Sequence, residues 1–175
     1  MGKDRGHSLR YQGGYTLLEV LIVLVILGIL IAIAAPGWLG FVQQRQLKTA
    51  QEQIQRAMYE AISIAKKDKL TYQVSFRESN ARLQYAIHLS STSSQTAFWQ
   101  SFTEQVQIDK NNTTFDWDNK NNIWLTQYNY RGNPNRGLGK ITLMARTSGS
   151  TKYCVMSSTL IGNTRLDRDK DCIKK

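Results

Sequence analysis

The sequence has few of the residues that enzymes most often use for catalysis. Only two of its 175 residues are histidines, His7 near the N-terminus and His88 within a predicted strand. A histidine in a strand is more often packed or exposed than catalytic. No Ser/His/Asp pattern, phosphate-binding P-loop or H-E-x-x-H zinc motif is present. We therefore expect a protein that is not an enzyme and needs no cofactor.

Metal ligands are also scarce. The two cysteines, Cys154 and Cys172, have 17 residues between them and form no C-x-x-C pair. Two cysteines cannot by themselves supply the four ligands of a structural zinc site. Asp109, Asp116 and Asp118 share one polar stretch, but their spacing lacks the Asp/Asn/Gly/Glu pattern of a calcium loop. No metal site is predicted.

Charge is absent from residues 20–44, although the mean hydropathy of the whole chain is only −0.41. The apolar part of this run ends at Val42 and is long enough for a helix to cross a membrane. No second run of this kind follows. The sequence thus predicts one apolar segment that anchors a polar domain of residues 43–175. This domain is long enough to have a hydrophobic core of its own.

The residues before this run indicate its orientation. Lys3, Arg5 and Arg10 outnumber Asp4, and positive flanks stay in the cytoplasm. Residues 1–14 are therefore expected inside and the C-terminal domain outside. The same pattern fits a secretory signal peptide, in which Ala32-Ile33-Ala34 would precede cleavage and the mature chain would start at Ala35.

Glu19 argues against the signal peptide. An acidic side chain inside a membrane helix costs about 2.5 to 3.5 kcal/mol on insertion scales, and such residues usually have a partner. Glu19 follows Gly13-Gly14 and then Tyr15-Thr16-Leu17-Leu18. This order resembles the precursors of the type IV pilin family, which carry a short basic leader ending in Gly, then an aromatic residue, Thr, two apolar residues and Glu. Tyr15 replaces the commoner Phe.

The resemblance implies a processing and assembly pathway. A membrane peptidase and methyltransferase would cut after Gly14, release residues 1–14 and methylate the amine of Tyr15. Residues 15–42 would form the membrane-spanning and polymerising half of the first helix. Glu19 would pair with the N-terminal amine of a neighbouring subunit. Because an unpaired carboxylate is unfavourable at low dielectric, only a subunit at the right axial offset would satisfy it.

Gly28 and Pro36 are candidate helix breaks. Proline removes a helical hydrogen bond, and glycine is a poor helix former. Pro36 falls where many pilins place a proline in the first helix. For the isolated subunit a mere kink is favoured. The alternative, implied by the resemblance, is that the helix melts between these positions in the filament and lets the filament stretch.

Periodicity predicts an α+β fold, in which the second half of a long N-terminal α-helix packs on an antiparallel β-sheet. Residues 44–69 place small apolar side chains on one helical face, namely Leu47, Ala50, Ile54, Ala57, Met58, Ala61, Ile62 and Ala65. Residues 70–89 alternate as a hairpin that turns at Ser79-Asn80. Residues 106–108 and 123–130 predict further strands, and 140–147 and 152–159 a last hairpin around Ser148-Gly149-Ser150.

Two connecting segments are expected to be irregular. The Ser/Thr-rich residues 90–105 predict a loop into which Phe98, Trp99 and Phe102 tuck. The polar residues 109–122 predict an exposed turn.

The last hairpin and the tail resemble, more loosely, the H-type minor pseudopilins of type II secretion and the FimT-like minor pilins. FimT-like tails of DNA-uptake systems carry a compact Gly-Arg-x-Arg, which Gly162, Arg165 and Arg168 match only in kind. Export to an oxidising compartment favours a Cys154–Cys172 disulfide, as in many pilins that close a C-terminal loop this way. Two reduced, buried cysteines are the alternative.

The net charge of +10 is unevenly distributed. Residues 131–175 hold ten cationic side chains against three aspartates, a net charge of +7. A basic region attracts polyanions such as DNA. A solvent-exposed charged face with no ligand is the alternative explanation. Asp167, Asp169 and Asp171 oppose DNA contact because their carboxylates repel phosphate. The candidate contacts are Arg146, Lys152, Arg165, Arg168, Lys170, Lys174 and Lys175.

The sequence as a whole predicts a minor type IV pilin that polymerises, with DNA uptake or adhesion as a further role of the basic region. Its expected partners are other pilin subunits, the prepilin peptidase/methyltransferase, the pilus assembly platform, the inner membrane and DNA. Before assembly it would cross the inner membrane once, and afterwards it would lie in a periplasmic or cell-surface filament. The alternatives are a type II secretion pseudopilin and a membrane-anchored binding domain that never polymerises.

Overall fold

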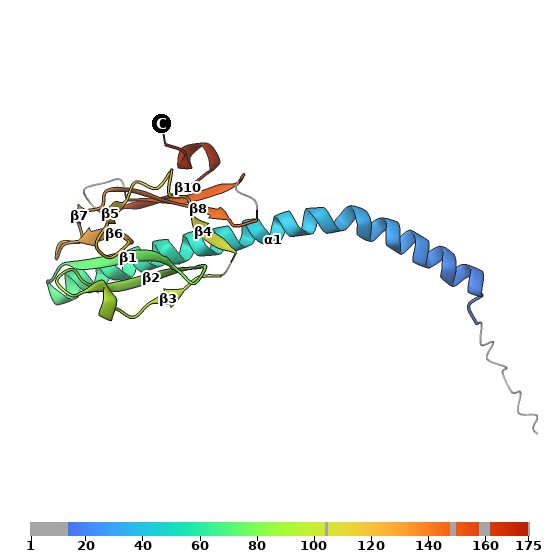
Figure 1. The fold of residues 1–175 in the computed structure, drawn as a ribbon, viewed down its shortest axis with the longest axis horizontal. Coiled ribbons are helices and arrows are strands. Elements are labelled where there is room, and N and C mark those ends of the chain that lie inside the picture. The colour runs from blue at the N-terminus through green and yellow to red at the C-terminus, as the bar shows by residue number, and fades with distance from the viewer. Residues whose placement is uncertain (1–13, 104, 148–149, 158–161, 175) are drawn as a thin grey trace, which may run out of the picture. The chain divides into compact units, whose positions relative to one another are not determined.

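A computed structural model describes residues 14–103, 105–147, 150–157 and 162–174. The chain divides into two compact units, the first ending at Gly40 and the second starting at Phe41. Helix α1 (Leu17–Asp68) begins in the first unit and ends in the second (Figure 1). Each unit is described by itself.

The first unit consists of the N-terminal half of α1 and the residues just before it. The Thr16 hydroxyl accepts a hydrogen bond from the Glu19 amide at 3.2 Å, which caps one of the unpaired N–H groups at the helix start. The apolar side chains from Leu17 to Ile33 are all exposed. Among the described residues no single helix meets the length and hydropathy expected of a membrane span, although Leu17–Ile33 and Gly37–Asp68 do so when taken together.

In the second unit, α1 buries the face that the sequence predicts. All eight small apolar residues predicted to share this face are buried, from Leu47 to Ala65. Lys66 and Lys67 lie in the last turn, where positive charge favours the helix C-terminus. Lys69 follows the helix with a left-handed φ of 56°. The predicted helix is thus confirmed, with its end one residue earlier than expected.

One antiparallel sheet follows the helix in the chain. Its strands are β1 (Tyr72–Ser79), β2 (Arg82–Leu89), β3 (Gln100–Ser101), β5 (Asp116–Asp118) and β6 (Ile123–Tyr128), in the spatial order β3-β2-β1-β6-β5, and β7 (Pro134–Arg136) also pairs with β6. Asn80 and Ala81 connect β1 to β2 with φ of 50° and 56°. Two consecutive positive φ values suit the twist of a two-residue hairpin loop. The predicted hairpin is confirmed, and its turn is centred one residue later than expected.

The other antiparallel sheet contains β4 (Val106–Ile108), β8 (Gly139–Ala145), β9 (Lys152–Ser157) and β10 (Thr164–Arg168), in the order β10-β9-β8-β4. Strands β8 and β9 confirm the predicted last hairpin, whose turn lies partly outside the described residues. Strand β10 pairs with β9 through the tail, where no strand is predicted, and η2 (Asp169–Cys172) follows it.

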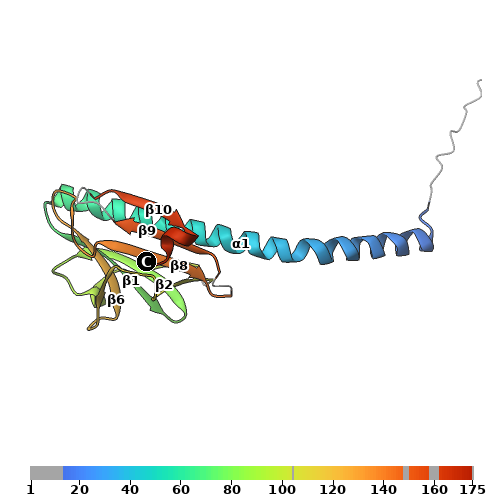
Figure 2. The ribbon, with the colours of Figure 1, turned by 90° about the horizontal axis from the view of Figure 1, so that it is seen from above.

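The core of the second unit lies where α1 meets both sheets. Leu47, Ile54 and Met58 of the helix share one apolar cluster with Val74 and Phe76 of the first sheet. Ile141, Leu143 and Val155 complete this cluster from the second sheet. Figures 1 and 2 show this half of α1 running along the strands, with β9 and β10 beside it. The predicted α+β fold of a long helix packed on antiparallel sheet is confirmed.

Both segments predicted to be irregular contain structure. Residues 90–105 hold the short helix η1 (Ser94–Thr96) and strand β3. Phe102 is buried and Trp99 is half-buried, but Phe98 is 80% exposed, so its predicted burial is wrong. Residues 109–122 are not simply an exposed turn, because they contain β5 and bury Asp109, Asn112, Thr113 and Phe115. Hydrogen bonds within this segment make its polar burial possible.

Candidate functional site

The predicted processing site lies at the start of the described chain. Gly14 is exposed, and a Cβ placed on it would meet no other atom within 4 Å. Tyr15 is 83% exposed and precedes the helix. Among the described residues, nothing therefore covers the predicted cleavage point between these two residues. Residues 1–13, the rest of the predicted leader, lie outside the described residues.

Glu19 lies in the first turn of α1, on an exposed apolar surface. A carboxylate here favours the helix, because the unpaired N–H groups give the N-terminus a partial positive charge. Within the described residues it has no salt bridge. The surrounding apolar side chains, including Leu18, Val20 and Ile22, are 47–70% exposed. Contiguous apolar exposure on this scale marks a surface that contacts lipid or protein.

The bounds of helix α1 include both predicted break positions. Gly28 has open space where a Cβ would stand, so the described subunit offers no packing reason for a glycine there. The backbone is helical at Pro36 as well. Melting of this segment is a hypothesis about the assembled filament and stays a prediction.

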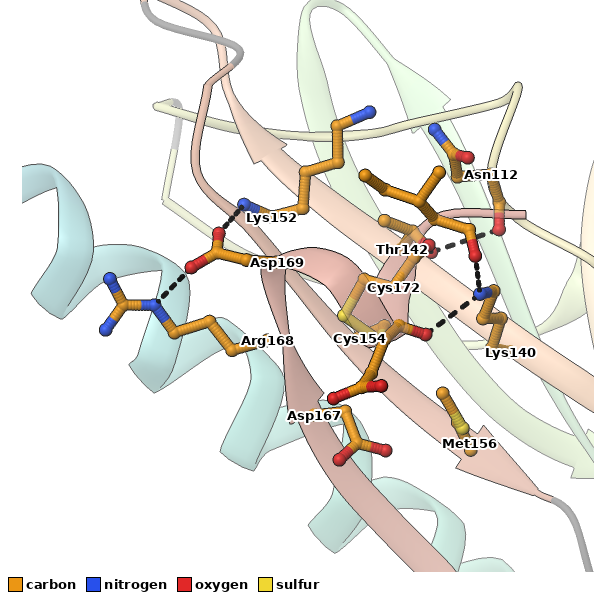
Figure 3. Close-up of a disulfide and its surroundings, with 12 residues drawn as sticks. Asn112, Lys140, Thr142, Lys152, Cys154, Met156, Asp167, Arg168, Asp169 and Cys172 are labelled. Atoms are coloured by element: carbon orange, nitrogen blue, oxygen red, sulfur yellow. Dashed lines mark hydrogen bonds and ion pairs between the residues drawn. A yellow bond between two sulfur atoms is a disulfide. The ribbon is translucent and has the colours of Figure 1, made fainter. Parts of the chain in front are cut away.

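The predicted disulfide joins Cys154 of β9 to Cys172 of η2, with Cα atoms 5.5 Å apart. Both cysteines are fully buried. Figure 3 shows the polar side chains that surround it. The Thr142 hydroxyl oxygen lies 3.1 Å from the Asn112 carbonyl and 3.3 Å from the Cys172 carbonyl, and its single proton is shared between these two acceptors. The disulfide prediction is confirmed, and it fastens the C-terminal segment onto the second sheet.

Lys140 holds the C-terminal segment from the other side. Its ammonium donates to the carbonyls of Asp171 and Ile173 at 3.0 and 2.8 Å (Figure 3). Burial lowers the pKa of Lys140, and the carboxylates of Asp171 and Asp167 oppose that shift. The Lys174 amide donates to the Asn112 side chain at 2.9 Å. The segment after β10 therefore has a fixed position.

Lys152 forms an internal ion pair. Its ammonium lies 2.6 Å from Oδ2 of Asp109, whose side chain is 5% exposed. The same carboxylate accepts from the Asn112 amide at 2.7 Å. Burial acts to raise the pKa of Asp109, but hydrogen bonds from Lys152 and Asn112 and the lysine charge together lower it. The backbone amide of Lys152 also donates to Asp169 at 3.1 Å.

The described candidate polyanion contacts lie on different parts of the second sheet and of the segment that follows it. Arg165 and Arg168 lie on β10 and pair with Asp167 and Asp169 at 2.6 and 2.9 Å. Arg146 follows β8, next to β4 at the opposite edge of the same sheet. Lys170 and Lys174 are exposed, and Lys175 lies outside the described residues.

His88, the histidine outside the predicted leader, is packed between strands. It is 8% exposed, and its Nε2 lies 2.9 Å from the hydroxyl of Ser75. Nδ1 lies 2.9 Å from the Leu89 carbonyl, which accepts only, so Nδ1 donates and Nε2 accepts from Ser75. Ser75 is completely buried. Because the serine hydroxyl is buried, this serine–histidine pair stabilises the sheet and presents no accessible nucleophile.

Gln51 is a structural residue that the sequence reasoning missed. It lies on the buried face of α1, and its side-chain amide donates to the carbonyls of Cys154 and Asp167 at 2.8 and 2.9 Å. One glutamine thus ties the helix to β9 and β10 at once. The available signal was its position between Leu47 and Ile54 on the apolar helical face.

Comparison with protein families gives one match, to the prokaryotic N-terminal methylation motif over residues 9–35. No curated protein and no solved structure matches the chain significantly. The motif covers Gly14, Tyr15 and Glu19, and its family is structural rather than enzymatic. It implies processing by a prepilin peptidase and assembly with other pilin subunits, and it is consistent with a membrane-anchored N-terminus. The narrower resemblance to FimT-like or H-type proteins concerns residues beyond this match and stays a prediction. The chain carries the N-terminus of a type IV pilin-like prepilin.

Proposed function

We propose that this protein is a minor pilin of a type IV pilus. The observation that carries the proposal is the methylation motif at residues 9–35, followed by an exposed apolar helix with one carboxylate near its start. In the precursor, residues 15–42 anchor the chain once in the inner membrane, with the N-terminus in the cytoplasm. Cleavage after Gly14 and methylation of Tyr15 then release it for assembly.

Glu19 sets the axial register of the subunit in this proposal. The cleaved chain begins at Tyr15, so its amine lies about one helical turn from Glu19. A neighbouring subunit shifted along the filament axis offers its own Tyr15 amine to this carboxylate. A charge pair in an apolar layer favours only the offset at which both charges are satisfied.

Residues 43–175 form the exposed part of the filament subunit. Its fold is held by the core shared between α1 and both sheets and by the Cys154–Cys172 disulfide. The basic C-terminal region, residues 131–175, is then available for adhesion or DNA uptake. This additional role is inferred from the charge of the region alone. A type II secretion pseudopilin would have the same N-terminus, and a non-polymerising anchor would share only the apolar helix.

Mass spectrometry of the mature N-terminus tests the processing step. The expected first residue is an N-methylated Tyr15. A chain that begins at Ala35 contradicts the proposal, and so does an uncleaved chain in a strain with an active prepilin peptidase.

Incorporation into sheared filaments tests the assembly step. Glu19→Val is expected to leave cleavage and membrane insertion intact and to reduce incorporation, because the lost charge is unfavourable in the membrane and is needed only for pairing. Glu52→Gln is the matched control, since Glu52 lies on the same helix in the polar part and forms an exposed pair with Arg56. Equal incorporation of both variants would contradict the register role of Glu19. If the wild-type protein were instead recovered from the pseudopilus of a type II secretion system, the pseudopilin alternative would be favoured.

A further inference from the structure

A small pocket opens in the second unit where the ends of the two sheets approach each other. Its volume is about 180 Å³, and residues from the ends of β1 and β4 and from β5 and β6 line it. Glu78, in β1, accepts a hydrogen bond from the Ile108 amide of β4 at 2.8 Å. This bond joins the first sheet to the second at the pocket and fixes its walls relative to each other.

Two tryptophans form one wall of the pocket. Trp117 and Trp124 are directly opposite each other in the β5–β6 pair, with ring centroids 4.7 Å apart and planes tilted by 52°. The Trp117 indole N–H donates to the Asn119 side chain at 2.6 Å, which sets the orientation of that ring. Both rings are half-buried, so part of their aromatic surface stays accessible. A preorganised aromatic surface binds with little loss of side-chain entropy.

Polar groups of both signs surround this aromatic wall. Glu78, Lys110 and Asn122 line the pocket and are all exposed. Oε1 of Glu78 accepts the Ile108 amide, and the described residues place no hydrogen bond on Oε2. The pocket therefore offers a carboxylate acceptor, an ammonium donor and an amide that can do both. Arg77 lines the pocket too, but its guanidinium lies 3.9 Å from the centroid of the Trp99 ring and donates to the Gln84 side chain at 2.9 Å. The Glu78 carboxylate in the same lining would repel a multiply charged anion.

We propose that this pocket binds one pyranose ring of a neutral saccharide. A volume of about 180 Å³ holds roughly six water molecules, which is the scale of one sugar ring. The flat face of a pyranose presents polarised C–H groups, which match the negative face of an aromatic ring. Its hydroxyls both donate and accept, so they match Glu78, Lys110 and Asn122. A few convergent polar groups on an apolar wall are typical of small-ligand sites.

The proposal is independent of filament assembly, so the test uses the unassembled full chain in a zwitterionic detergent without a sugar headgroup. The protein is labelled with 5-fluorotryptophan and observed by ¹⁹F NMR, with methyl β-D-glucopyranoside as the probe. We expect the Trp117 and Trp124 signals to shift saturably at millimolar probe, while that of Trp38, in the first unit, stays constant. Sorbitol has the hydroxyls without the flat ring and is expected to shift none of them.

Variants assign the binding energy to the pocket. Trp117→Ala is expected to weaken binding at least about tenfold, followed through the Trp124 signal. Lys110→Met removes a donor and should weaken binding, whereas Lys120→Met, in the β5–β6 turn outside the pocket, should not. Unshifted Trp117 and Trp124 signals in the wild-type chain would overturn the proposal. Equal shifts of all four tryptophans, or equal shifts with sorbitol, would overturn it as well.

Discussion

The ammonium of Lys152 lies 2.6 Å from a carboxylate oxygen of Asp109, although 43 positions separate the two residues in the sequence. This pair joins the loop after β4 to the start of β9. Asn112 hydrogen-bonds to the same carboxylate and, through its own side-chain oxygen, accepts the Lys174 amide. The pair therefore belongs to the polar network that fixes the C-terminal segment.

Asp109→Ala is expected to lower the free energy of unfolding by about 3 kcal/mol, because it leaves the partly buried Lys152 ammonium and the Asn112 amide without their acceptor. The double variant Asp109→Leu/Lys152→Leu should recover much of this loss, since neither charge then remains. Urea unfolding of the full chain in detergent gives both values. Equal destabilisation of the single and double variants would show that packing, not charge, dominates.

The same pair predicts a loss of stability in acid. The pKa of Asp109 is lower in the folded chain than in the unfolded chain, where it is about 3.9. The unfolded chain therefore binds the proton more readily, and stability rises with pH through this range. The contribution of Asp109 is complete above the unfolded pKa and is lost as the pH falls through the folded pKa. Unfolding of the wild type and of Asp109→Asn, compared from neutral pH down to about pH 3, should show a smaller loss for the variant.

Gln51→Ala is expected to destabilise the second unit by about 1 to 3 kcal/mol, because the carbonyls of Cys154 and Asp167 lose their donor inside the fold. Gln53→Ala is the matched control, since Gln53 is exposed on the same helix. Hydrogen exchange should also increase in β10 for the Gln51 variant only. A variant as stable as the control would mean that water replaces the glutamine amide.

Regular periodicity explains why the sequence predicted the helix and both hairpins correctly. The face from Leu47 to Ala65 and the alternation through Val74 and Phe76 each reflect one buried side of an element. Buried polar residues follow no such periodic pattern in the sequence. Asp109 and Asn112 resemble any solvated loop until their partners, which lie far away in the sequence, are known.

The short strands were missed for a related reason. β5, β7 and β10 contain three to five residues and are mostly polar, so their pairing depends on neighbouring strands rather than on their own composition. The motif around Glu19 was predicted correctly because it is a fixed order of residue types, which can be recognised in the sequence without any structural information.

Removal of the disulfide by the double variant Cys154→Ala/Cys172→Ala is expected to lower the free energy of unfolding by about 3 kcal/mol, the value for a closed loop of this length. The fold should persist, because Lys140, Gln51 and Asn112 hold the same segment by hydrogen bonds. Lys140→Met in the disulfide-free chain should then release the C-terminal segment, as faster proteolysis near Lys170. Proteolysis at the same rate in both backgrounds would contradict this shared role.

The basic C-terminal region predicts DNA binding whose strength depends on the aspartates beside its arginines. Asp167 and Asp169 pair with Arg165 and Arg168, and exposed pairs of this kind are weak enough for phosphate to compete. Arg165→Gln/Arg168→Gln should weaken duplex binding for all sequences and flatten the salt slope by about 2. Asp167→Asn should strengthen binding, because it removes a carboxylate that repels phosphate and frees the Arg165 guanidinium.

Fluorescence anisotropy of a labelled duplex with the full chain in detergent, at two salt concentrations, measures these effects. Arg56→Gln is the control, because Arg56 is an exposed arginine on α1, outside the basic C-terminal region. Reducing the disulfide should also weaken binding, since a loosened segment must be ordered again when DNA binds. If micromolar protein at low salt leaves the anisotropy unchanged, the positive charge of residues 131–175 does not bind DNA.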